Sequence, residues 1–237
     1  MCVAFCRCSL LILLCIPATL YLGFRWLGNT GYYPVAFAVL LECMAPFFLV
    51  FEGRRPQARE LVVLAVMCAL AVAGRVAIPI PSFKAIFGII MIAGIAFGPE
   101  SGFLVGAISA LASNFFYSQG PYTPWQMMAY GAGGMLAGFV FAEGRLPRKP
   151  VVMGIFGFLA VAFFVGPLLD TCSVFLVMSR ITLKGAMAFY ISGFPVNLRQ
   201  AVATAIVLLV LGKPLLEKLD RIKTKYGILD DEGRKEA

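Results

Sequence analysis

Long runs of apolar residues, separated by short polar segments, dominate the hydrophobic pattern of this chain. A helix needs about 20 apolar residues to cross the hydrocarbon core of a bilayer, and the runs recur at close to this length until residue 212. The predicted membrane spans are residues 8–27, 34–51, 60–79, 84–98, 102–117, 124–142, 150–177 and 189–212. The pattern therefore predicts an all-α protein, a polytopic transmembrane helical bundle.

Two connections stand out from the others. The fourth and fifth spans meet at the segment Gly98-Pro99-Glu100-Ser101-Gly102, whose glycines and proline predict a tight turn. After the last span the chain becomes charged from Lys213 onward. We expect an interfacial helix there, followed by a frayed end, with no domain of its own.

Composition supports the membrane assignment. Of the 237 residues, 61% are hydrophobic and 14% charged, and the mean hydropathy is +0.90, which is far from the values of a soluble domain. The net charge of +8 comes from lysines and arginines that gather in alternate loops and in the C-terminal tail. This bias predicts a multi-pass protein of the cell membrane with both termini in the cytoplasm, and no nucleic-acid partner.

Several kinds of chemistry are missing from the sequence. There is no histidine, and the seven cysteines lie mostly in apolar segments, where we interpret them as small buried hydrophobic residues. We therefore expect neither a metal site nor a cofactor. Gly212-Lys213 is followed by Pro214 and does not form a phosphate-binding loop, so the chain is not expected to hydrolyse ATP or to be an enzyme.

One loop on the predicted outer side, between the fifth and sixth spans, mixes aromatic rings with amide and hydroxyl groups. A pocket for a ring-bearing organic ligand needs such a mixture, because rings supply apolar area and a few polar groups fix the orientation. The candidate binding residues of this loop are Asn114, Phe115, Phe116, Tyr122, Trp125 and Gln126. The alternative interpretation is an aromatic belt at the level of the lipid headgroups.

Polar residues inside the last two predicted spans are further candidates, since charges within a bilayer are costly and often functional. Arg199 lies roughly 15 Å and Asp170 roughly 12 Å from the outer end of its span, at about 1.5 Å per residue. Asn197 is close to Arg199, and Pro195 loosens the helix start. These residues either face the ligand, or Asp170 and Arg199 form a structural ion pair.

Glu42 is the other deep acid, and we favour a packing role for it, with Arg75 or Arg25 as partner. If Glu42 and Asp170 instead couple protons or sodium, the chain is an autonomous ion-coupled carrier of a small organic molecule. A membrane-embedded enzyme or an assembly factor is the least favoured alternative.

Rows of small residues mark faces on which helices approach closely. Ala65, Ala69 and Ala73 are spaced by four and share one helix face. Two further rows consist of Gly102, Gly106 and Ala110, and of Gly134 and Gly138. From the residues alone, internal packing is the favoured explanation of all three rows.

Over residues 60–212 the chain resembles a known family, the substrate-binding S components of energy-coupling factor (ECF) transporters. The alanine row is the weakest part of the resemblance, and the segments around residues 93–107 and 120–127 are the most specific. The motifs are Ala65-x3-Ala69-x3-Ala73, Pro81–Lys84, Ala93–Ala107, Ser113–Phe116 and Gly120–Met127.

The resemblance implies a six-helix substrate-binding core that captures a vitamin or related micronutrient for ATP-driven uptake. The partners it implies are a transmembrane coupling (T) subunit and two ATPase subunits, with the row from Ala65 to Ala73 as the docking face. The ligand would bind near the outer surface, which agrees with the residues chosen above. The chain would then consist of two additional N-terminal helices (1–58), the core (59–212) and a cytoplasmic tail (213–237).

The substrate is less closely defined by the resemblance. The stretch from Gly120 to Trp125 is similar to the branch of the family associated with cobalamin, which makes cobalamin the candidate substrate. A flavin, a queuosine precursor and other vitamins remain alternatives, since aromatic and amide pockets suit all of them.

Overall fold

The computed structural model describes residues 58–178 and 180–227, together with residues 18, 19, 22, 34, 35, 37–42, 44 and 45. These residues form helices without any strand, which confirms the predicted fold class. The helices are α3 (Ala58–Val76), α4 (Ile86–Phe97), α5 (Pro99–Tyr117), α6 (Thr123–Phe141), η2 (Ala142–Gly144), α7 (Pro150–Ala160), η3 (Val161–Val165), α8 (Gly166–Val177) and α9 (Leu183–Tyr226).

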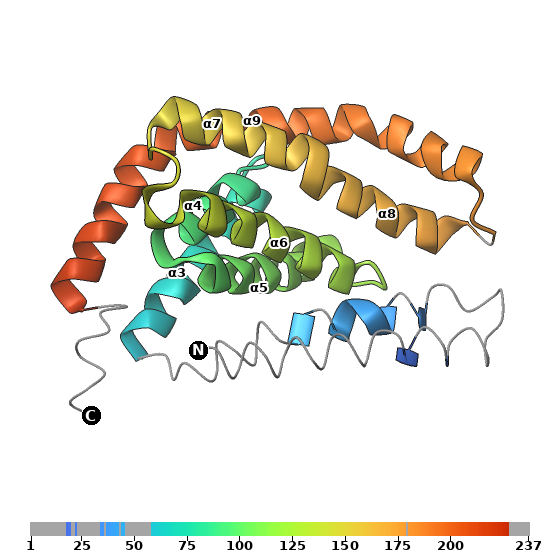
Figure 1. The fold of residues 1–237 in the computed structure, drawn as a ribbon, viewed down its shortest axis with the longest axis horizontal. Helices are drawn as coiled ribbons and strands as arrows, with labels where there is room; N and C mark the ends of the chain where they lie inside the picture. The colour runs from blue at the N-terminus through green and yellow to red at the C-terminus, as the bar shows by residue number, and fades with distance from the viewer. Residues whose placement is uncertain are drawn as a thin grey trace.

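The segments α7, η3 and α8 follow one another without a break, so the described part contains six main rods, as expected for residues 59–212 (Figure 1). The two spans predicted at 8–27 and 34–51 lie mostly outside the described residues.

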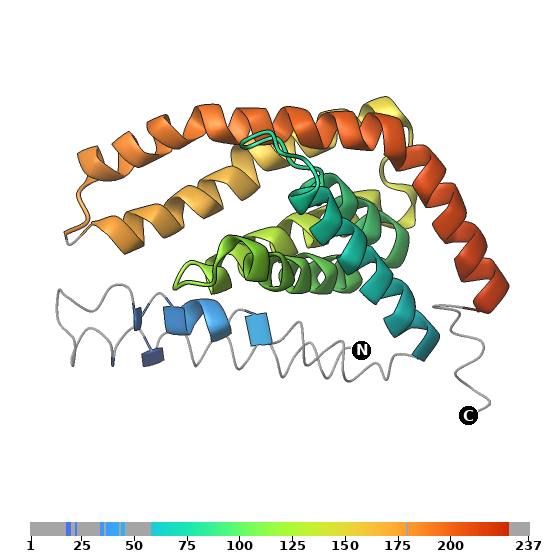
Figure 2. The same ribbon diagram turned by 180° about the vertical axis from the view of Figure 1, so that it is seen from behind.

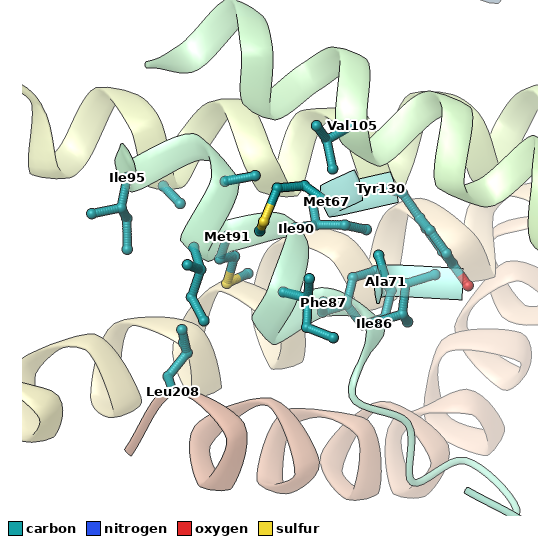
Figure 3. Close-up of a cluster of buried hydrophobic side chains, with 14 of the residues drawn as sticks. Met67, Ala71, Ile86, Phe87, Ile90, Met91, Ile95, Val105, Tyr130 and Leu208 are labelled. Carbon is teal, nitrogen blue, oxygen red and sulfur yellow. The ribbon is translucent and has the colours of Figure 1, made fainter. Parts of the chain in front are cut away.

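Helix α4 lies at the centre of the bundle. All 12 of its residues are buried, because α3, α5, α6 and α9 pack around it on different sides. Figure 3 shows Ile90 and Met91 of α4 among Met67 of α3, Val105 of α5 and Leu208 of α9. A helix that is apolar on every face requires such a surrounding.

Glycines bring α4, α5 and α6 into backbone contact. A Cβ added at Gly102 would lie 2.6 Å from the carbonyl oxygen of Gly134 and 2.7 Å from the Cα of Gly94, so no larger residue fits there. Gly138 likewise faces the backbone of Pro99. Because lipid supplies little hydrophobic drive between helices, this close approach is a main source of helix association. The glycine rows of α5 and α6 thus serve internal packing, as predicted.

The turn between α4 and α5 is tighter than the sequence predicted. Helix α4 ends at Phe97 and α5 already begins at Pro99, so Gly98 alone connects them. Gly98 has φ +92°, which favours glycine, and proline is well suited to the first turn of a helix, where its missing N–H is not needed. The predicted turn residues Glu100 and Ser101 therefore belong to α5.

The last two rods are long and apolar enough to cross a membrane, namely Pro150–Val177 and Leu183–Tyr226, and α4 is a shorter apolar helix. In the first of these, the π-helical turn η3 separates α7 from α8. The second, α9, has 44 residues, or about 66 Å at about 1.5 Å per residue, whereas the hydrocarbon core is about 30 Å thick. It therefore extends well beyond the predicted span 189–212.

The C-terminal part of α9 bends away from the direction of its first part (Figure 2), and it reaches the end of α4. Pro214 supplies a cause for the bend, because proline removes a hydrogen bond inside a helix. Beyond it, Lys223 Nζ donates to the carbonyl oxygen of Ala96 at 2.7 Å, and Arg148 Nη2 donates to that of Ile95 at 3.2 Å. Cations at the C-terminal end of a helix are stabilising. In its described part, the predicted interfacial helix is thus a continuation of α9.

Candidate functional site

A buried polar network joins the ends of α3, α5 and α6 on the predicted outer side. Its centre is Asn114, which is 0% exposed. The Asn114 Nδ2 group donates to Gln126 Oε1 at 2.9 Å and to Thr123 Oγ1 at 3.2 Å, and both of these residues lie in the first turn of α6. Thr123 Oγ1 in turn donates to Gln119 Oε1 at 2.9 Å, which fixes the loop before α6.

Arg75 completes this network from α3. Its Nη1 group donates to Asn114 Oδ1 at 2.9 Å and to Ser113 Oγ. The guanidinium carbon lies 4.9 Å from the ring centroid of Tyr117 and 5.6 Å from that of Tyr130, which are cation–π distances. From the sequence, Arg75 was considered only as a partner for Glu42. Its contacts with Ser113 and Asn114 are not evident there, because these residues lie 38 and 39 positions further along the chain.

A second polar cluster lies between α8 and α9. Asn197 Nδ2 donates to Asp170 Oδ2 at 2.7 Å, and the Thr171 and Tyr190 hydroxyls lie 2.9 Å apart. Asp170 therefore contacts a polar residue of α9, as expected. The residue that it contacts is Asn197, and not Arg199.

Two glycines make room for this pair. A Cβ added at Gly193 would lie 2.8 Å from Asp170 Oδ2, and one added at Gly166 would lie 2.7 Å from Asn197 Nδ2. Gly166 is also the first residue after the π-helical turn η3, a feature that is frequent at functional sites. The local backbone is thus built around the Asp170–Asn197 pair.

Trp125 connects α6 with α8. Its ring stacks on Phe175, with centroids 5.4 Å apart and an interplanar angle of 25°. The indole Nε1–H is buried and has no hydrogen-bond partner among the described residues, which is unusual for tryptophan. The described residues Leu40 and Met44 form a small cluster with α5, against which Trp125 also packs. Trp125 thus lies between the core and the N-terminal segment.

The other aromatic candidates point elsewhere. Phe115 and Phe116 are 76% and 68% exposed, and the structure does not bring their rings together with the buried Asn114 side chain. Tyr122 is half-buried, and its hydroxyl donates to the carbonyl oxygen of Ser118 at 2.7 Å, which closes the loop before α6.

Among the described residues, neither Asp170 with Arg199 nor Glu42 with Arg75 forms an ion pair. Arg199 is exposed on α9, and within the described residues no ion pair joins it to Asp170, because the neighbouring Asn197 occupies the carboxylate instead. The Glu42 carboxylate accepts a hydrogen bond from the Thr19 hydroxyl, whereas Arg75 bonds to Ser113 and Asn114. Arg25, the other expected partner of Glu42, lies outside the described residues.

The alanine row borders an apolar groove between α3 and α5. Ala65, Ala69 and Ala73 are all exposed, and they line a cavity of about 650 Å³. The opposite wall consists of α5 residues that include Leu104, Ile108 and Phe116. The row is therefore not used for internal packing, which was the interpretation favoured from the residues alone.

The cysteines of the core fit their predicted role. Cys68 and Cys172 are buried and unpaired. Throughout residues 58–178 and 180–227, no three potential metal-binding side chains come together.

A bundle of apolar helices, with buried polar clusters and an open apolar groove, is typical of an integral membrane protein. A family model described as "ECF-type riboflavin transporter, S component" matches residues 56–217. The chain belongs to this family of S components, which confirms the resemblance found in the sequence. Neither the curated proteins nor the solved structures include a significant match.

The Asp170–Asn197 pair gives a stability prediction. Replacing Asn197 by leucine leaves the Asp170 carboxylate without its donor, which costs about 1–3 kcal/mol, whereas replacing both partners by apolar residues is nearly neutral. We therefore expect Asn197→Leu to lower the thermal unfolding temperature in detergent more than the double variant Asp170→Leu/Asn197→Leu does. A double variant that is less stable than the single one would contradict this account of the pair.

Proposed function

We propose that this protein captures riboflavin on the outer side of the membrane and passes it to energising partner subunits. The observation that carries the proposal is the match of residues 56–217 to the S components of ECF-type riboflavin transporters. Members of this family are membrane transport subunits, so no chemical step on the substrate is required of the chain.

The chemistry of the outer polar clusters supports a flavin. The isoalloxazine ring of riboflavin is flat, and one of its edges carries carbonyl and N–H groups. Trp125 and Phe175 have flat aromatic faces, and the indole N–H of Trp125, which has no acceptor among the described residues, can donate a hydrogen bond to a ligand. Gln126, the next residue after Trp125, supplies an amide, and the Asp170–Asn197 pair supplies a carboxylate and an amide from α8, the helix that also carries Phe175, and from α9. Rings with a few placed polar groups are typical of ligand sites.

The finer roles of the candidate residues follow from these positions. We assign stacking to Trp125 and orientation of the ligand to Gln126, Asp170 and Asn197. Asn114 supports Gln126 from below, since both hydrogens of its amide are already used by Thr123 and Gln126. Tyr122 shapes the loop, and the exposed Phe115, Phe116 and Arg199 take part only if a partner or the lipid covers them.

Cobalamin, the candidate from the sequence resemblance, is less well supported. The matched family is described by riboflavin, and cobalamin is several times larger than a flavin. The alternative of an autonomous ion-coupled carrier is also less well supported, because the matched family consists of S components.

The groove between α3 and α5 is the proposed docking face. Its occupant is a helix of the transmembrane coupling subunit, which in turn carries the two ATPase subunits. The support for this assignment is family membership together with three exposed alanines, which let a second helix approach closely. With both termini in the cytoplasm, the polar clusters open to the outside and the cationic end of α9 lies inside.

Riboflavin binding tests the proposal directly. We expect the purified protein to quench riboflavin fluorescence on titration, and Trp125→Ala to weaken the affinity roughly tenfold or more, since stacking of a ring on an aromatic side chain contributes about 1–3 kcal/mol. Phe139→Ala, at an exposed position of the same helix, serves as the control and leaves the affinity unchanged. Tight binding of cyanocobalamin without any riboflavin binding would reverse the substrate assignment.

The docking face gives a separate prediction. A tryptophan in place of Ala69 fills the groove, so Ala69→Trp abolishes riboflavin uptake in cells that express the complete transporter, while the purified variant still binds riboflavin. Leu70→Trp is the matched control, because Leu70 is exposed on α3 but does not line the groove. Normal uptake by the Ala69→Trp variant would rule out this face.

A further inference from the structure

Helix α3 carries the proposed docking face but is only partly packed against the rest of the core. It lies on α4 and α5, and the apolar cavity of about 650 Å³ separates part of α3 from α5. The wall of this cavity extends up to Ala73 and Val76, on either side of Arg75. The position of the outer end of α3 therefore determines how wide the groove is.

The Arg75 side chain links this end of α3 to the polar network of α5, beside two backbone contacts: the Tyr117 hydroxyl donates to the Arg75 carbonyl oxygen at 3.0 Å, and the Ala85 N–H to that of Gly74 at 3.1 Å. Arg75 bonds to Ser113 and Asn114 of α5 and stands against the rings of Tyr117 and Tyr130, as described above. In the described part of the chain no carboxylate pairs with it. Within these residues its guanidinium contacts amide and hydroxyl oxygens and ring faces. Such a contact is weaker than a buried ion pair, and it depends on how the amide of Asn114 is turned.

The side-chain amide of Asn114 also contacts Gln126, which we assign to the substrate site. Asn114 uses its oxygen for Arg75 and its nitrogen for Gln126 and Thr123. A ligand that donates a hydrogen bond to Gln126 Oε1 competes with Asn114 for this acceptor. Without the hydrogen bond to Gln126, the orientation of the Asn114 amide is less constrained, and its oxygen can turn away from Arg75. The exchange of one hydrogen bond on α6 is thus transmitted to α3 through the side chains of Asn114 and Arg75.

We propose that Arg75 is a positioning residue that couples ligand binding at Gln126 to the width of the α3–α5 groove, and thereby to docking of the coupling subunit. The inference rests on the proposed function and adds a mechanism to it. Occupancy at α6 changes the hydrogen bonds of Asn114, which strengthens or weakens the hold of the Arg75 side chain on the outer end of α3. The width of the groove is the quantity that changes, and the ligand acts on it through Arg75.

The test measures the dissociation constant between the purified chain and the module of coupling subunit and ATPases, in nanodiscs, with and without saturating riboflavin. In the unaltered protein we expect riboflavin to change this constant at least fivefold, the lower range of typical coupling. In Arg75→Met the change falls below twofold, while riboflavin affinity stays within threefold. Arg75→Lys, which keeps the charge against the rings, restores part of the coupling.

Two further variants separate coupling from folding. Arg59→Met removes an exposed arginine from the other end of α3 and is expected to keep the full riboflavin effect. Asn114→Asp still accepts from Arg75 but no longer donates to Gln126, so it folds with a new ion pair and loses the riboflavin effect on docking. If Arg75→Met retained the full effect, or lost riboflavin binding and docking together, the proposal would be overturned.

A ligand-free comparison distinguishes failure of this inference from failure of the proposed function. If the unaltered protein bound no riboflavin, the proposed substrate would be wrong. The coupling is then judged from Gln126→Leu, which removes the acceptor that a ligand would take. We expect this substitution to change the docking constant at least fivefold in the presence of Arg75 and less than twofold in the Arg75→Met background. Equal changes in the docking constant in both backgrounds would show that Arg75 does not couple Gln126 to docking.

Discussion

The structure depends on the backbone contact among α4, α5 and α6. The contact requires glycine at Gly94, Gly102 and Gly134, because a Cβ at any of them would meet the backbone of a neighbouring helix. It holds α5 and α6 against α4, whose other sides α3 and α9 cover, and fixes how far α5 and α6 extend past it. The buried amide of Asn114 and the first turn of α6 therefore meet at one end of the bundle. In lipid, these polar groups must satisfy one another, which gives the outer network its connected form.

Much of this arrangement could be predicted from the sequence. Apolar runs of near-spanning length gave six rods in the right order, and the glycine rows of α5 and α6 indicated close packing. The extent of α9 could not be predicted, because its charged C-terminal part, with Leu216 and Leu219 facing inward, does not differ in pattern from a separate interfacial helix. The length of the α4–α5 turn was also predicted wrongly, because a proline is as common in a turn as in the first turn of a helix, and Pro99 here begins α5.

The sequence indicated which residues gather in the two polar clusters better than it indicated which way their side chains face. Asn114 and Gln126 are bonded, and Asp170 meets Asn197. The segment 113–117 is polar, then aromatic, with no apolar stripe to define its inward face, so the outward direction of Phe115 and Phe116 could not be derived. Arg199 follows Asn197 by two residues, which places it on another face of α9. Arg75 was overlooked because a charge at a helix end is usually solvated, whereas here two tyrosine rings and Asn114 enclose it.

Capture from outside requires that the loop before α6 face the medium and the bent end of α9 face the cytosol. Single cysteines in place of Gln119 and Lys218, in an otherwise cysteine-free chain, report both sides when intact cells are treated with a membrane-impermeant maleimide. We expect labelling at position 119 in intact cells and at position 218 only after the membrane is opened. The reverse pattern would place the polar clusters on the cytosolic side and contradict the role of the chain in uptake.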